Sequence, residues 1–193
     1  MLVIPEESPS LITIIGIDPG TSFLGVCEMT INLETLLIVN IKAYTLNAAK
    51  LYTFVNESMI ERLGERAWRI YCLQRRLFSI FQQIKVSSIA YEHPFYNPKR
   101  PQAFMALLEA KAAIMNACQL HDSTMLPIPI DPSSIKNSVG AKGNVGKDPI
   151  REAILKLYPK DSLVLPQGDL DEHSCDAIAV AHCRYLRMFG SRK

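Results

Sequence analysis

The chain lacks any apolar run long enough to cross a membrane. It has 193 residues, and its longest uncharged apolar stretches, such as residues 11–17, fall far short of the ~18–20 residues that a membrane-spanning helix needs. Lysine and arginine are also missing before Lys42, whereas Glu6 and Glu7 are present, which is typical of neither a secretory signal nor an Arg-rich transit peptide. We therefore expect a cytoplasmic protein with no membrane partner.

The chain also lacks an excess of charge of either sign. It has 21 lysines and arginines and 19 aspartates and glutamates, which gives a net charge of +2. Bulk charge therefore gives no indication of a polyanionic partner. Hydrophobic residues make up 48% of the chain and charged residues 21%, close to the globular average, so disordered and fibrous classes are excluded.

Paired cysteines are missing as well. The cysteines are odd in number and scattered, and no two of them have CxxC spacing: Cys27, Cys72, Cys118, Cys175 and Cys183. Several lie in apolar runs, where a free cysteine behaves as a small hydrophobic residue. We expect reduced thiols and no zinc site built on paired thiols.

The chain does contain an alternation of strand and helix patterns. β-rich apolar or partly alternating runs predict five strands, at residues 11–18, 23–30, 36–46, 86–92 and 125–130. The remaining patterns predict four helices, at residues 55–84, 104–120, 148–157 and 172–189. This order predicts an α/β fold with a mixed five-stranded sheet, in which three antiparallel strands are followed by parallel additions, and helices on both faces. We expect a single domain at residues 11–189 between short tails at 1–10 and 190–193.

Two acidic side chains stand at the ends of apolar strands. Asp18 ends the first predicted strand and Glu92 ends the fourth. Taken singly, each is also explained as a turn cap or a solvated strand end. A charge in such a place is costly to bury unless it is paired or bound to a metal, and ligands gather at strand ends in α/β sheets. The two positions are therefore candidates for one site.

A third acid lies on the last predicted helix. Asp176 is followed by small apolar residues, which indicates close packing of this helix against the sheet. His173 lies ~60° from Asp176 around the helix and shares its face. We interpret the nearby Asp169, Asp171 and Glu172 as helix-capping acids. A cluster of carboxylates with one histidine suits Mg²⁺ or Mn²⁺ better than Zn²⁺.

Three motifs, taken in order, resemble the RuvC-type Holliday-junction resolvases. They are Ile-Gly-Ile-Asp-Pro-Gly-Thr at residues 15–21, Tyr-Glu at 91–92 and Asp-Ala-Ile-Ala-Val-Ala at 176–181. Each motif alone is a weak signal, but their order and spacing together are specific, and the resemblance extends over residues 11–185. It implies a homodimeric, Mg²⁺-dependent nuclease of the RNase H-like fold that cuts branched DNA in a bacterial cell or a phage-infected host.

The resemblance also implies which residues do the chemistry. The family's catalytic acids fall on Asp18, Glu92 and Asp176, and the position three residues before the last acid holds His173. Aspartate is common at that position in the family, and histidine is found in some members. The three acids would ligate two Mg²⁺ ions in each active site, and His173 would either ligate a metal or orient a water. Because histidine brings one negative charge fewer than aspartate, we expect Mn²⁺ to substitute for Mg²⁺.

Residues 132–147 contain three lysines and no acid, which indicates a local positive charge beside the site. The lysines are Lys136, Lys142 and Lys147. Glycine-rich residues 138–148 predict a mobile basic loop whose backbone N–H groups can approach phosphates. Read alone, such a loop is usually a solvated surface. The resemblance favours DNA contact, because the family carries lysines at the places of Lys136 and Lys147, to which we add Lys142.

One aromatic side chain also qualifies as a DNA contact. Phe95 follows Glu92 in a proline-bounded loop, with Lys99 and Arg100 just beyond. An aromatic residue in this place either covers the core or stacks on a base at the junction. Family members carry an aromatic residue at this position, which favours the stacking role for Phe95.

Other functional classes compete with this hypothesis. The Asp-Pro-Gly-Thr turn also resembles the first phosphate loop of actin- and hexokinase-type ATPases, but those need two duplicated domains, which 193 residues cannot hold. The alternatives that stay open are an RNase H-like protein that binds junctions without cutting them and a nuclease that acts mainly on flaps or forks. The sequence identifies no branch-migration partner.

Overall fold

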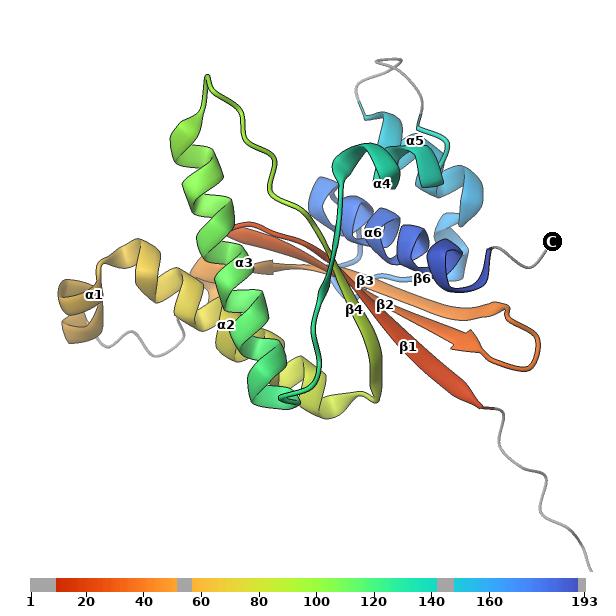
Figure 1. Cartoon of the computed structure of the whole chain (residues 1–193), viewed down its shortest axis with the longest axis horizontal. Helices are drawn as coiled ribbons and strands as arrows, with labels where there is room; N and C mark the ends of the chain where they lie inside the picture. Colours follow the sequence, from red (N-terminus) through yellow and green to blue (C-terminus); the bar gives the residue numbers. More distant parts are fainter. Residues whose placement is uncertain (1–9, 52–56, 142–147, 191–193) are drawn as a thin grey trace, which may run out of the picture.

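A mixed sheet of six strands forms the centre of the fold. The structure is a computed structural model and describes residues 10–51, 57–141 and 148–190. The strands lie in the order β5-β4-β1-β2-β3-β6 (Figure 1). They are β1 (Leu11–Asp18), β2 (Phe23–Asn32), β3 (Ile38–Asn47), β4 (Val86–Glu92), β5 (Ile128–Ile130) and β6 (Leu163–Val164). The mixed sheet is confirmed, with six strands in place of the expected five because β6 pairs with the edge strand β3.

The strand directions agree with the predicted order. β1, β2 and β3 form an antiparallel meander, and β4 and β5 extend the sheet in parallel on the other side of β1. β1 therefore lies in the interior of the sheet. Its side chains Ile14, Ile15 and Ile17 are fully buried, which explains why its sequence is a continuous apolar run and not an alternating one.

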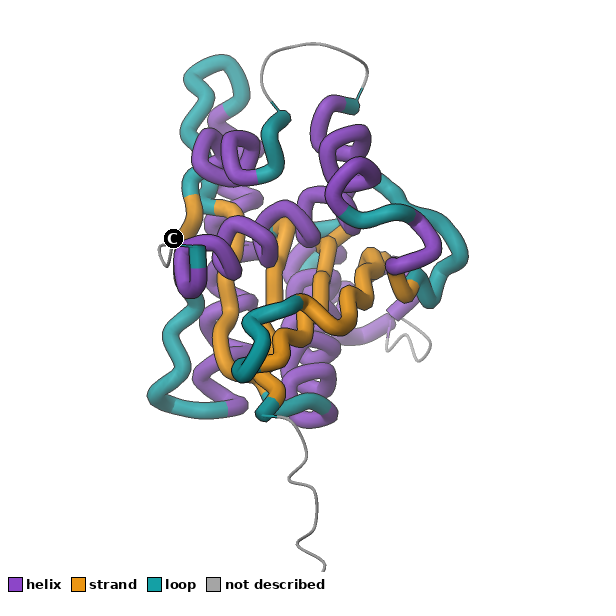
Figure 2. Tube along the Cα trace, turned by 90° about the vertical axis from the view of Figure 1, so that its right-hand side faces the viewer, coloured by secondary structure: helices purple, strands orange, loops and turns teal. Residues whose placement is uncertain are grey.

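Helices cover both faces of the sheet. The α-helices within the described residues are α1 (Glu57–Leu63), α2 (Glu65–Gln83), α3 (Pro101–His121), α4 (Pro132–Ser138), α5 (Pro149–Leu157) and α6 (Glu172–Phe189). The short 3₁₀ helices η1 (Ala48–Leu51) and η2 (Lys160–Ser162) join other elements. α4, α5 and α6 lie on one face, and α2 and α3 lie on the other (Figures 1 and 2). Across these ranges of the chain, no helix is both long and apolar enough to cross a membrane.

The long helix expected at residues 55–84 is in fact two helices. α1 ends at Leu63, and Gly64 acts as the N-cap of α2 with a φ of 78° and a ψ of 150°. A positive φ cannot continue a right-handed helix, and glycine adopts it without steric cost. The apolar pattern continues across the break, so periodicity alone does not reveal it.

The five cysteines are free, as expected from their spacing. Cys27, Cys118, Cys175 and Cys183 are buried, and burial raises the pKa of both Cys118 and Cys175 to about 12. These two side chains therefore remain protonated thiols near neutral pH and serve the core as small hydrophobic groups.

Alternation along β1 decides which way the strand-end acid points. Ile14 belongs to the core under α6, whereas Ile15 and Ile17 belong to the core under α2 and α3. Because successive strand side chains point to opposite faces, Gly16 and then Asp18 follow Ile14 on the α6 face. The acid at the end of β1 therefore points to the side of the sheet on which α6 lies.

α6 packs unusually close to the sheet. A Cβ atom built on Gly16 would lie 2.6 Å from the Ala181 backbone nitrogen, and one on Gly25 would overlap the carbonyl of His173. Only glycine fits at these two strand positions while the helix stays in place. The contact brings the first turns of α6 directly over the ends of β1 and β2.

Candidate active site

Two acids lie side by side at the end of the sheet. β1 and β4 are parallel neighbours, with Gly16 opposite Ala90 and Ile17 opposite Tyr91. Asp18 and Glu92, the next residues along each strand, therefore end adjacent strands on the same face. The register of the β1–β4 pairing therefore brings together two acids that are 74 residues apart in the sequence.

The N-terminal turns of α6 bring the third acid. The helix begins with a capping box, in which the Asp171 carboxylate accepts a 2.8 Å hydrogen bond from the Ser174 N–H and Ser174 Oγ accepts one of 2.9 Å from the Asp171 N–H. Asp171 is therefore a cap, as the sequence indicates, and Asp169 lies outside the helix in a 2.9 Å ion pair with Lys160. Asp176 lies on the next turn and is partly buried.

His173 is bonded directly to the acid of β1. Its Nδ1 lies 2.7 Å from Asp18 Oδ2, and the hydrogen bond raises the pKa of His173 above its ordinary value. The Asp18 side chain is only 15% exposed, so the imidazole contacts an oxygen that water reaches poorly. The bond fixes the ring orientation and one oxygen of the carboxylate together.

Phe23 contacts the imidazole ring of His173, and the sequence analysis did not identify it as a site residue. The Phe23 ring stacks on His173, with centroids 5.7 Å apart and planes inclined by 15°. Phe23 is the first residue of β2, two positions before Gly25, whose Cα faces the His173 backbone. The same two-residue alternation that places Asp18 would have placed Phe23 on this face.

The three carboxyl groups interact through their charges. Burial first, and then the charge of Asp18, raises the pKa of Glu92 to about 7, an effect that Lys136 partly opposes. Burial also raises the pKa of Asp176 to about 7, with further contributions from Asp18 and Glu92. Glu92 and Asp176 are thus harder to ionise because they are buried and because their neighbours are acids. The site concentrates negative charge without enough positive charge to balance it.

Such a donor set fits a divalent cation. Within the described parts of the chain, no group of three or more His, Cys, Asp or Glu side chains is arranged so that it could hold a metal ion. The carboxylate oxygens are nevertheless the hard ligands that Mg²⁺ and Mn²⁺ prefer. A cation would also remove the repulsion that raises the pKa values of Glu92 and Asp176.

Two of the predicted DNA contacts line a cleft beside the acids. The cleft has a volume of about 580 Å³, and its lining includes Glu92, Phe95, Ser133 and Lys136. Phe95 is 71% exposed, so its ring is accessible to a ligand. Lys142 and Lys147 lie outside the described residues.

Lys136 does not lie on a flexible loop. It is in the last turn of α4, a helix that the sequence analysis did not predict. The Asp131 side chain caps this helix by accepting a 2.8 Å hydrogen bond from the Ser134 N–H, and Pro132 occupies its first turn. The helix fixes the backbone of Lys136, and its exposed side chain lines the same cleft as Glu92.

Comparison with known proteins shows which proteins the chain resembles. No family model matches the chain. The crossover junction endodeoxyribonuclease RuvC of Carboxydothermus hydrogenoformans is 25% identical over 177 residues, which covers 92% of this chain and 98% of the relative. The protein of the same name from Dehalococcoides mccartyi is 26% identical over 173 residues, 89% of this chain and 90% of the relative. Over most of its length the chain is similar to RuvC-type proteins.

Solved structures show that the RuvC-type likeness extends to the fold. T. thermophilus RuvC, in complex with a Holliday junction substrate, superposes with a TM-score of 0.64 at 16% identity over 93% of this chain and 97% of the other. The yeast mitochondrial Holliday junction resolvase Ydc2 gives a TM-score of 0.53 at 11% identity over 91% and 80% of the two chains. The expected RNase H-like fold is thereby confirmed.

Proposed function

We propose that this protein is an endonuclease that resolves four-way DNA junctions by metal-dependent phosphodiester hydrolysis. The observation that carries the proposal is the meeting of Asp18, Glu92 and Asp176 at one end of the sheet, with pKa values of about 7 for the last two. Carboxylates that repel one another in this way attract cations. The RuvC-type relatives supply the substrate class.

The acids and His173 have separate roles in this proposal. Asp18, Glu92 and Asp176 would hold two Mg²⁺ ions, with Mn²⁺ as a substitute, and His173 would complete the set. The bound ions would supply an activated water and stabilise the leaving oxygen. The hydrogen bond from His173 Nδ1 to Asp18 Oδ2 keeps the second oxygen of Asp18 free for a ligand.

The cleft beside the acids is the proposed DNA contact. Lys136 is placed to meet a backbone phosphate next to Glu92, and the exposed ring of Phe95 is placed to stack on an unpaired base. We also propose Lys142 and Lys147 as DNA contacts, on the grounds of residue type and family resemblance alone. A symmetric four-way junction needs two nicks, so we propose a two-fold homodimer with one site in each subunit.

The decisive experiment compares Asp18→Asn with Asp169→Asn on a labelled four-way junction. Asp169 is a solvent-exposed acid paired with Lys160 and lies outside α6, so its variant controls for the loss of one negative charge. We expect Asp18→Asn to bind the junction and not cut it in Mg²⁺ or Mn²⁺, while Asp169→Asn cuts normally. Normal cutting by Asp18→Asn would refute the site. Wild type that binds but leaves the junction uncut in both metals would make the protein a binding scaffold, and parallel flap and fork substrates define the substrate range.

A further inference from the structure

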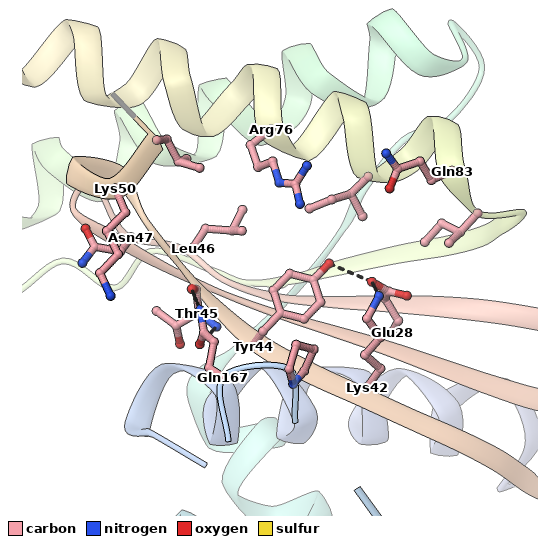
Figure 3. A pocket seen from close by; sticks show the side chains of 14 residues that line it. Glu28, Lys42, Tyr44, Thr45, Leu46, Asn47, Lys50, Arg76, Gln83 and Gln167 are labelled. Carbon is pink, nitrogen blue, oxygen red and sulfur yellow. Dashed lines mark hydrogen bonds and ion pairs between the residues drawn. The ribbon is translucent and has the colours of Figure 1, made fainter. Parts of the chain in front are cut away.

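A second cleft lies on the opposite face of the sheet, away from the acids. It has a volume of about 340 Å³ and is enclosed by β2 and β3 below and by α2 above (Figure 3). This volume lies within the range of small-ligand sites. Apolar side chains form much of its lining, among them Leu46, Ile80 and Ile84. A flat ring system can bury its faces against such a surface.

One end of this cleft holds a buried carboxyl group. Glu28 is 7% exposed, and its Oε1 accepts hydrogen bonds from Lys42 Nζ at 3.0 Å and from the Tyr44 hydroxyl at 2.7 Å. Burial and the neighbouring Glu28 raise the pKa of Tyr44, so the phenol stays protonated and donates. No hydrogen bond to Glu28 Oε2 is found among the described residues. This end of the cleft therefore offers an acceptor to a ligand that carries N–H groups.

The cleft as a whole is positively charged. Its lining contains three cationic side chains, Lys42, Lys50 and Arg76, and one acid, Glu28, which gives 3 − 1 = +2. Lys42 is paired with Glu28, whereas within the described chain Lys50 and Arg76 make no ion pair. Figure 3 shows Arg76 reaching into the cleft from α2, and Lys50 at the end away from Glu28. These two cations are available to an anionic group.

The two ends of the cleft are separated along β3. Glu28 pairs with Lys42 across the sheet, and Asn47, near Lys50, lies five residues further along β3, roughly 16 Å for an extended strand. The Gln167 side chain closes the edge by bonding the backbone of Thr45 on both sides, at 3.0 Å to its N–H and 2.6 Å to its carbonyl. The cleft therefore has a fixed length and a closed side.

We propose that this cleft binds a guanine nucleotide. The base would lie on the apolar surface with its N1–H and amino groups directed at Glu28, and the phosphate would lie between Arg76 and Lys50. Guanine fits better than thymine because its adjacent N1–H and amino groups can both donate to Glu28 Oε2, the oxygen without a hydrogen bond among the described residues. Thymine has one ring N–H, flanked by carbonyl oxygens that Glu28 would repel. The nucleotide is either free or an unpaired residue of branched DNA, and the site does not depend on cleavage.

The test is calorimetric titration of the full chain in metal-free buffer with dGMP, dTMP and deoxyguanosine. We expect dGMP to bind with a dissociation constant of about 1 mM or below, and dTMP and deoxyguanosine to bind at least about tenfold more weakly. Arg76→Glu and Lys50→Glu should each weaken dGMP binding by about tenfold or more. Arg75→Glu is the matched control, because Arg75 is the exposed neighbour of Arg76 on α2 and does not line the cleft.

Several results would overturn the proposal. These are no binding of dGMP at about 10 mM, equal affinity for dGMP and dTMP, or an equal loss in Arg75→Glu and Arg76→Glu. The source of the nucleotide is separated by junction binding with the Asp18→Asn variant. If dGMP displaces the junction, and adding Arg76→Glu to Asp18→Asn weakens junction binding, the cleft binds a nucleotide of the DNA. If dGMP binds without displacing the junction, the cleft binds a free nucleotide. Because no cleavage is measured, these results are independent of whether the protein is a junction nuclease.

Discussion

Replacing Asp176 by asparagine is expected to stabilise the protein in the absence of metal. In the folded state the pKa of this carboxyl group is about 7, because of burial and the charges of Asp18 and Glu92, against an ordinary value of 3.8. The folded protein therefore keeps a proton on Asp176 at pH values where the unfolded chain has lost it. Ionising this group costs folding free energy, and asparagine removes that cost.

The sign and size of the effect follow from proton linkage. Below about pH 4 both states hold the proton, and Asp176 contributes no pH dependence to the free energy of unfolding. Between pH 4 and 7 the folded state binds more protons, so stability falls as the pH rises. Above pH 7 the loss is complete and amounts to roughly 4 kcal/mol, from a shift of about three pKa units at 1.36 kcal/mol each. Glu92 shares the same repulsion, so the losses at the two acids do not add.

Urea denaturation of wild type and Asp176→Asn at pH 4 and pH 8, with EDTA, measures this difference. The variant should gain up to about 4 kcal/mol over wild type at pH 8 and little at pH 4. Mg²⁺ should then stabilise wild type more than the variant, because binding to the folded state adds about 2.7 kcal/mol at 100 times the dissociation constant. Asp169→Asn is a control of opposite sign, since the ion pair with Lys160 lowers the pKa of Asp169.

The reasoning would fail if Asp176→Asn were less stable than wild type at pH 8 without metal. It would also fail if the gain were the same at both pH values, because an effect of packing or helix propensity has no such dependence. Equal stabilisation of both proteins by Mg²⁺ would remove Asp176 from the set of metal ligands while leaving the pKa argument intact.

Three further substitutions test separate parts of the site. Phe23→Ala should lower the kcat of junction cleavage by about 10-fold with little change in KM, because the stacked ring positions His173, and Phe23→Tyr should restore it. Lys136→Ala should weaken junction binding about equally for all sequences and reduce the salt dependence by about one phosphate contact, as measured by titration at several salt concentrations. Gly16→Ala should cost about 3 kcal/mol in urea denaturation, because its Cβ would lie 2.6 Å from the Ala181 backbone nitrogen.

Local patterns predict the fold well where one residue type dominates a whole element. The apolar run of β1 indicates a strand covered on both faces, and it is buried on both. β6 is different, because two residues, Leu163–Val164, carry no period that can be recognised. The break at Gly64 also escapes prediction, since isolated glycines occur within helices and only the φ of this residue separates the two cases.

α4 shows how one signal can have two meanings. Asp131 and Pro132 follow directly after β5 and indicate the end of a strand, yet the same pair is a side-chain cap followed by a proline in the first helical turn. The two interpretations differ only in whether the residues after Pro132 form a helix or a loop. Choosing the first leaves Lys136 on a loop, whereas the structure fixes it on a short helix beside Glu92.

Positions of the acids are predictable in a way that their contacts are not. Strand ends and helical angle place Asp18, Glu92 and Asp176 at one edge of the sheet. The bond between His173 and Asp18 joins residues 155 positions apart, and it depends on how deeply α6 sits on the sheet. The depth depends on Gly16 and Gly25, which have no Cβ and so let the helix backbone approach the sheet. It does not depend on the acids or on His173.

The close approach of α6 explains why a nearly neutral chain contains carboxyl groups with strongly raised pKa values. Because glycines at positions 16 and 25 admit the helix backbone, Asp176 is brought against the sheet and loses water, and its pKa rises. A helix held further out would hydrate the acid, relieve the repulsion and weaken the attraction for a cation. The packing of α6 thus sets how strongly the site attracts a cation, and the net charge of +2 averages over this acidic site and basic residues elsewhere in the sequence.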